Sequence, residues 1–185
     1  MKSKTPAILG EVNTYRMCES KQAYYLVKTL NSKKPQVAVL PKCLASTFGI
    51  SLPFDQKDFS FEAITIAKDG DFPLVCAKPE LIALKEEFTF SDDGRSFVAI
   101  VENVSTKYGV TLRFSGGITK LVSLKDVSQA DKVVENYPLG KVVRVAINTK
   151  TSRLSLKRSV IDSVDSAAVK RDQNCLLQSF DKLST

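Results

Sequence analysis

The residue types that carry out most enzyme chemistry are scarce in this chain of 185 residues. It contains no histidine, so it can form neither a Ser-His-Asp triad nor a zinc site that uses histidine. Asp92 and Asp93 are adjacent carboxylates beside Gly94, a pattern typical of a solvated turn. Gly116-Gly117 fits neither glycine-rich phosphate-binding motif. We therefore expect a binding protein with no catalytic residue, no metal, no cofactor and no small-molecule substrate.

Four cysteines occur at scattered positions: Cys18, Cys43, Cys76 and Cys175. None forms a Cys-x-x-Cys pair, which argues against a metal site or a redox motif. The basic N-terminus leads into no apolar segment of the kind found in signal peptides, and no apolar run approaches the roughly 18 residues of a membrane span. We expect reduced thiols in an intracellular protein that does not enter a membrane.

The distribution of charge indicates a polyanionic partner. The chain carries a formal net charge of +7 and has a pI near 9.2. The basic excess is greatest in residues 91–160, which hold 12 Lys and Arg against 6 Asp and Glu. Residues 161–185 hold 3 against 4 and are slightly acidic. Nucleic acid is the favoured partner, and the alternative is a soluble protein that happens to be basic.

Short alternating apolar patterns predict two successive sets of five strands. We expect the first set at residues 7–15, 23–29, 36–40, 59–67 and 72–78, and the second at residues 96–104, 110–114, 118–122, 141–147 and 153–157. In both sets the longest connection follows the third strand, and residues 128–138 there favour a short helix. This layout is that of the OB-fold Greek-key barrel, so we expect a mainly β chain with two tandem five-stranded barrels.

The same patterns set the expected domain boundaries. We expect one barrel at residues 5–84, a connector at 85–94, a second barrel at 95–160 and a helical segment at 161–185. The apolar residues 81–84 should pack on the first barrel. The C-terminal helix should begin near Asp162 or Ser163, either of which has a side chain suited to the N-cap. Packing on the second barrel is its expected role, and binding to a partner is the secondary one.

Four sequence blocks in the second set resemble a known domain. They are Val-x-Asn-Val-x-x-x-Tyr-Gly-Val from Val101, Gly-Gly-Ile-x-x-Leu-Val-Ser-Leu from Gly116, Pro-Leu-Gly-Lys-Val-Val-Arg-Val from Pro138, and Arg-Leu-Ser-Leu-Lys from Arg153. Together, over residues 95–157, they resemble the RNA-binding domain first described in ribosomal protein S-one. The resemblance implies an OB fold that binds single-stranded RNA on one face.

The tandem arrangement is similar to that of a multi-repeat family. Residues 77–82 and 156–161 resemble repeat ends of the ribosomal RNA processing protein five family. That similarity implies a piece of a longer scaffold in the nucleus and nucleolus, acting in ribosomal RNA processing. Single-stranded or pre-ribosomal RNA and other ribosome assembly proteins are the implied partners.

The resemblance to the S-one domain also implies an RNA-binding face. Its aromatic positions fall at Tyr108 and Thr111, its frequent histidine at Ser123, and its last polar positions at Asn148 and Arg153. Tyr108 and Arg153 are kept, Asn148 is a softened substitution, and the residue types at the other two positions are lost. These losses favour an alternative function, a protein-interaction module whose barrels no longer contact RNA.

The chemistry of these residues supports the same face. Tyr108 offers a ring beside a glycine, and Arg153 can bind a phosphate with two donors or stack on a base. Further cations extend the expected phosphate-binding groove: Arg113, Lys120, Lys107 and Arg144. The alternatives remain that Tyr108 packs on Leu112, and that the side chains of Lys107, Lys120 and Lys132 are only solvated.

The first set of strands keeps less of this chemistry. Tyr24 and Tyr25 are adjacent in the second strand, so only one of them can face outward. Phe72 or Pro73 stands where the second set has Arg153. We expect the first barrel to be mainly structural or to face a protein.

Overall fold

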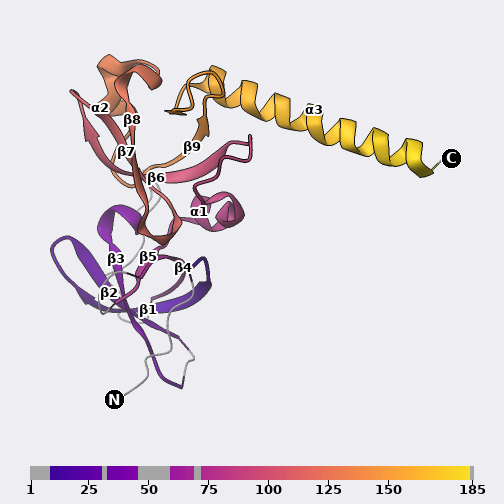
Figure 1. Cartoon of the computed structure of the whole chain (residues 1–185). Coiled ribbons are helices and arrows are strands. Elements are labelled where there is room, and N and C mark those ends of the chain that lie inside the picture. Colours follow the sequence, from indigo (N-terminus) through magenta and orange to yellow (C-terminus); the bar gives the residue numbers. More distant parts are fainter. Residues whose placement is uncertain (1–8, 31–32, 46–58, 69–71, 184–185) are drawn as a thin grey trace.

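The computed structural model describes residues 9–30, 33–45, 59–68 and 72–183, and its N-terminal half contains a closed five-stranded barrel (Figure 1). β3 and β5 pair in parallel and the other neighbours are antiparallel, as in an OB barrel. The strands follow the order β1-β2-β3-β5-β4 around the barrel, and a 3₁₀ turn, η1 (Lys42–Leu44), follows the third. Their bounds are β1 (Val12–Ser20), β2 (Tyr24–Thr29), β3 (Val37–Pro41), β4 (Ser60–Ala67) and β5 (Leu74–Cys76).

The second half repeats this order as the sheet β10-β9-β6-β7-β8. Its two outer strands, β8 and β10, lie close together without a ladder between them. The strands are β6 (Phe97–Ser105), β7 (Gly109–Arg113), β8 (Thr119–Ser123), β9 (Val142–Ile147) and β10 (Leu154–Ser155). The connections contain η3 (Ser115–Gly117), η4 (Leu124–Asp126), η5 (Ala130–Lys132) and the predicted short helix, α2 (Val133–Asn136). Two tandem OB-like barrels followed by a C-terminal helix are thus confirmed.

Two predicted elements were clearly misplaced. β1 runs to Ser20 and not to Tyr15, because Arg16 lies on the solvated face of the strand and does not end it. Residues 9–11 of the predicted strand precede β1, and residues 7–8 lie outside the described part. Helix α3 (Arg158–Leu183) begins before Asp162, so neither Asp162 nor Ser163 caps it. Because Ile161 is buried, the apolar stripe of the helix starts one turn earlier than predicted.

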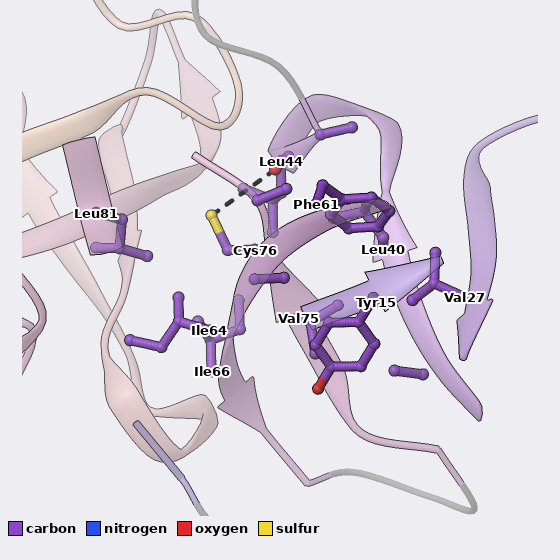
Figure 2. Close-up of a cluster of buried hydrophobic side chains, with 14 of the residues drawn as sticks. Tyr15, Val27, Leu40, Leu44, Phe61, Ile64, Ile66, Val75, Cys76 and Leu81 are labelled. Atoms are coloured by element: carbon purple, nitrogen blue, oxygen red, sulfur yellow. Dashed lines mark hydrogen bonds between the residues drawn. The ribbon is translucent and has the colours of Figure 1, made fainter. Parts of the chain in front are cut away.

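The core of the first barrel is filled by the inward side chains of its strands (Figure 2). Tyr15 lies within it, with a ring centroid 6.3 Å from that of Phe61. Cys76 is fully buried and its Sγ donates to the Leu44 carbonyl oxygen at 3.8 Å. Burial raises the pKa of this thiol to about 12, so Cys76 acts as an apolar core residue.

Strand β6 is buried on both faces. Five successive residues, Phe97–Val101, are at most 2% exposed. Phe97, Ala99 and Val101 belong to the core of the second barrel. Val98 and Ile100 point the other way and join the core cluster of the first barrel. One strand therefore completes two cores, and the barrels share an apolar interface.

The segment between the barrels adds to this interface. Helix α1 (Pro79–Ala83) buries Leu81 completely in the first core, which confirms the predicted packing of the apolar stretch. The 3₁₀ turn η2 (Lys85–Glu87) follows, and Phe88 then forms a parallel bridge with Val98. The connector is thus held against both barrels.

A buried polar contact joins the same two parts. Lys78 is 5% exposed, and its ammonium donates to the carbonyl oxygen of Gly140. Gly140 has φ +82°, a conformation that favours glycine, and its amide donates to the Val101 carbonyl oxygen at 2.8 Å. A Cβ at this position would overlap the backbone oxygen of Cys43. Close backbone approach between the barrels therefore requires a glycine here.

Helix α3 packs on the second barrel through apolar residues near its start. Polar contacts continue to its middle, where Arg171 Nη2 donates to the Gly94 carbonyl oxygen at 3.0 Å and Asp172 pairs with Arg95 at 2.8 Å. Ile161 and Val164 pack on Ala146 of β9, and Ala168 is also buried. From Val169 to Gln178 the side chains are exposed, and the helix extends away from the barrels (Figure 1). None of the helices within the described ranges is both long and apolar enough to span a membrane.

The inter-barrel contact predicts unequal effects for two glycine substitutions. Gly140→Ala should lower the free energy of unfolding by at least about 1–3 kcal/mol more than Gly10→Ala, because the added methyl group must displace the Cys43 backbone. Gly10 has a similar φ of +78°, but no described residue other than its chain neighbours lies within 4 Å of an added Cβ, so Gly10→Ala should show only the backbone strain of about 1–2 kcal/mol. Urea unfolding of both variants measures the difference. Equal losses would show that the contact does not constrain the barrels.

Candidate nucleic-acid interface

The register of β7 and β8 brings several predicted residues to one surface. Val110 and Leu112 of β7 are fully buried, so the alternate residues face outward. Thr111 pairs with Leu121 of β8, and Gly109 pairs with Ser123. The outward surface of these two strands, which we call the β7–β8 face, therefore contains both predicted positions, Thr111 and Ser123.

Tyr108 stands at the end of this face. It lies in the turn between β6 and β7, where the Ser105 hydroxyl accepts the amides of Lys107 and Tyr108 at 3.2 and 3.1 Å. The tyrosine is 60% exposed, and the Lys107 ammonium lies 5.3 Å from its ring centroid. The turn thus holds an aromatic ring and a cation together in solvent, an arrangement suited to stacking on a base and contacting its phosphate.

Asn148 and Arg153 lie on the hairpin between β9 and β10. The Asn148 Oδ1 accepts the amide of Lys150 at 2.9 Å, and its backbone amide donates to the Arg153 carbonyl oxygen at 2.8 Å. Asn148 therefore shapes the turn with its side chain. The Arg153 side chain is 52% exposed, and its Nε lies 3.4 Å from Asp126 Oδ2. Since Asp126 follows Ser123 at the end of β8, this ion pair brings the hairpin beside the β7–β8 face.

Two predicted cations have other contacts: Lys120 lies on the opposite side of β8, and Arg113 lies on the β7–β8 face but is ion-paired. Lys120 pairs with the buried Leu112, so it points to the opposite side of β8 from Thr111. Its ammonium lies 5.3 Å from the ring centroid of Phe90. Arg113 is on the outward side, and its guanidinium is ion-paired with Glu102 of β6. The structure therefore does not gather these two cations with Tyr108 and Arg153 into one groove.

Arg144 takes part in a polar network at the base of α3. Its Nη1 donates to Glu87 Oε1 at 2.8 Å and to the Ser96 hydroxyl at 3.0 Å. Because the Glu87 carboxylate accepts this hydrogen bond, it raises the pKa of the guanidinium further. Ser96 in turn donates through its amide and hydroxyl to Asp165 of α3, at 2.9 and 2.7 Å. Arg144 thus links the connector, β6 and the helix, away from the β7–β8 face.

The first barrel shows a different outward face on its β1–β2–β3 sheet. Tyr25 pairs with the buried Leu40 and packs against the core, while Tyr24 is 37% exposed, which confirms that only one of the two faces outward. Arg16 lies directly opposite Lys28 on this face. The interface with β6 supports a structural role for this barrel, and its suggested role in facing a protein stays a prediction.

Two residues near the face were missed by sequence reasoning. Asp126 is 6% exposed, so it contributes a buried carboxylate beside Arg153. Leu121 is 54% exposed and lies directly opposite Thr111 on the same face. Leu121 could have been found from the alternation of β8, since it lies two residues before Ser123. The sequence carries no equivalent signal for Asp126, because its partner is distant along the chain.

Comparison with known proteins adds little to this picture. Neither the family models nor the curated proteins contain a match to this chain. One similar solved structure is described as a multidomain protein with nucleic acid binding domains from Streptococcus pneumoniae TIGR4, at 16% identity over 80% of this chain. This chain spans 44% of that one, and the TM-score of 0.29 is too low for the likeness to support an argument.

The polar network at the base of α3 predicts which of two helix carboxylates stabilises the chain. Asp165→Ala should lower the free energy of unfolding by about 1.5–3 kcal/mol, because it removes the charged acceptor of two hydrogen bonds that Ser96 donates. Asp162→Ala is the matched control on the same helix, since its pairing with Arg158 is exposed, and it should change stability by less than about 0.5 kcal/mol. Denaturant unfolding gives both values, and a similar small loss in both variants would contradict the anchoring role of Asp165.

Proposed function

We propose that the second barrel binds single-stranded RNA across the β7–β8 face and the adjoining β9–β10 hairpin. The observation that carries this proposal is the exposed ring of Tyr108, held beside Lys107 at the end of a surface bounded by Arg153. Unstacked bases are bound by aromatic rings because every base has a π-face. The two cations can contact the phosphates on either side of the stacked base.

The sequence resemblance to the S-one domain supports this assignment, and the resemblance of residues 77–82 and 156–161 to the ribosomal RNA processing protein five family carries its finer part. We propose that the chain belongs to a pre-ribosomal RNA processing and ribosome assembly factor of the nucleolus. Pre-ribosomal RNA and other assembly proteins are then its partners. In this proposal the chain acts by binding and scaffolding and has no catalytic role.

A protein-interaction module is the second candidate. Leu121 is 54% exposed on the proposed face itself, and α3 exposes Leu176 and Leu177 at 63% each. Exposed leucines are suited to an apolar partner surface, whereas they add little to phosphate binding. The two candidates separate in one measurement: a protein-interaction module does not bind single-stranded RNA at low salt.

Fluorescence anisotropy with a labelled single-stranded RNA of about 16 nucleotides tests the RNA proposal. The full chain should bind with an affinity that falls as salt rises. Tyr108→Ala should weaken binding by about 1–3 kcal/mol through loss of one stacked base. Arg153→Gln should also weaken binding and should reduce the salt slope by about 1 through loss of one phosphate contact.

Lys120→Gln is the matched control for these variants. It removes one positive charge from the same barrel, but that charge lies over Phe90 on the other side of β8. Its effect on affinity should be much smaller than that of Arg153→Gln. Equal losses for the two variants would mean that RNA responds to net charge alone, and absence of binding at low salt would reject the proposed function.

The S-one domain has a second aromatic residue where this chain has a threonine, so restoring an aromatic ring there should raise the affinity for RNA. Thr111 lies in the middle of the β7–β8 face and is partly exposed, so Thr111→Tyr adds a ring there without entering the core. Tyrosine also suits a β-strand. The variant should bind single-stranded RNA more tightly by about 1–3 kcal/mol, the contribution of one stacked base. Unchanged or weaker anisotropy binding by a folded Thr111→Tyr variant would place the RNA elsewhere.

A further inference from the structure

We propose that Asp126 is a positioning residue for RNA binding: it holds Arg153 by the guanidinium Nε so that both Nη groups face a backbone phosphate. The inference rests on the proposed function, since it concerns the same surface of the second barrel. The group of the RNA that binds here is a backbone phosphate, and Asp126 orients the arginine that binds it.

Asp126 is buried, and its backbone is held by hydrogen bonds at the end of β10. It is 6% exposed, although its carboxylate pairs with a side chain that is 52% exposed. Its backbone oxygen accepts the Leu156 amide at 2.9 Å and lies 3.4 Å from the Ser155 hydroxyl. These contacts join η4 to β10 where β8 and β10 have no ladder. The carboxylate is therefore attached to a backbone that is held from two sides.

The ion pair uses only part of the guanidinium. Arginine has five N–H donors, and the pairing distance of 3.4 Å is to Nε. The two terminal nitrogens remain able to bind a phosphate with parallel hydrogen bonds, a geometry that lysine does not offer. A long exposed side chain otherwise loses rotamer freedom when it binds, and an anchor at Nε removes part of that loss in advance.

The negative charge of Asp126 also repels a phosphate, so the two effects must be compared. A phosphate bound by the Nη groups lies about 4 Å from the guanidinium charge and about twice as far from the carboxylate behind it. At equal dielectric the attraction is then about twice the repulsion, because Coulomb energy falls as the inverse of distance. Direct binding to Arg153 therefore prevails, and positioning adds to it.

The test measures single-stranded RNA binding by the full chain in a double-mutant cycle. The variants are Asp126→Ala, Arg153→Gln and the double variant, with thermal unfolding to confirm that each is folded at the binding temperature. Asp126→Ala should weaken binding about two- to tenfold, which is the effect of releasing one side chain. It should cause no further loss in the Arg153→Gln background, because the carboxylate acts through that arginine.

Two controls separate positioning from a general structural effect. Asp126→Asn keeps an oxygen acceptor for Nε and should recover most of the affinity. Asp131→Ala removes an exposed carboxylate from the same connection and should change binding by less than about twofold. Unchanged binding by Asp126→Ala, or a loss that persists in the Arg153→Gln background, would overturn the inference. Absence of RNA binding by the unmodified chain would instead reject the proposed function itself.

Discussion

Burial of strand β6 on both faces is the constraint on which the arrangement of the chain depends. Alternate side chains of a strand point to opposite faces, so a strand of an ordinary barrel buries only half of its residues. Here Val98 and Ile100 enter the core of the first barrel while Phe97, Ala99 and Val101 fill that of the second. Separating the barrels would expose Val98, Ile100 and the residues of the first core that they cover. The two barrels are therefore held together by apolar burial, and the directional Lys78–Gly140 hydrogen bond helps to fix their relative orientation.

This constraint also determines which surfaces remain for a ligand. One side of β6 is taken by the first barrel, and the start of β9 is covered by the connector through Glu87 and Arg144. On the outward side of β8, Leu121 is 54% exposed, and the hairpin that carries Arg153 adjoins the end of β8 through Asp126. The candidate site thus lies on the part of the second barrel that the interface leaves open.

The fold was predictable because its signals are local. Turn residues and alternation gave the strand order, and the repetition of that order identified two OB-like barrels. Alternation predicts one buried face for residues 96–104, so it does not predict the burial of both Val98 and Ile100 on the other face. An uninterrupted apolar run is the available signal for a strand buried on both faces. The start of α3 was also misplaced, because Ile161 packs on a strand distant in sequence.

The candidate site was less predictable because charge pairing is not local. Every arginine in residues 95–157 has a carboxylate within ion-pair distance, and two of these carboxylates, Glu87 and Asp172, lie outside that window. The basic excess counted along the sequence therefore overstates the positive charge that the barrel offers to a polyanion. Arg113 and Arg144 pair with carboxylates of the barrel and the connector through their terminal nitrogens. Arg153 pairs through Nε, and its side chain is 52% exposed. An arginine can thus be ion-paired and still be suited to bind phosphate, and the guanidinium nitrogen that pairs with the carboxylate decides which role the arginine has.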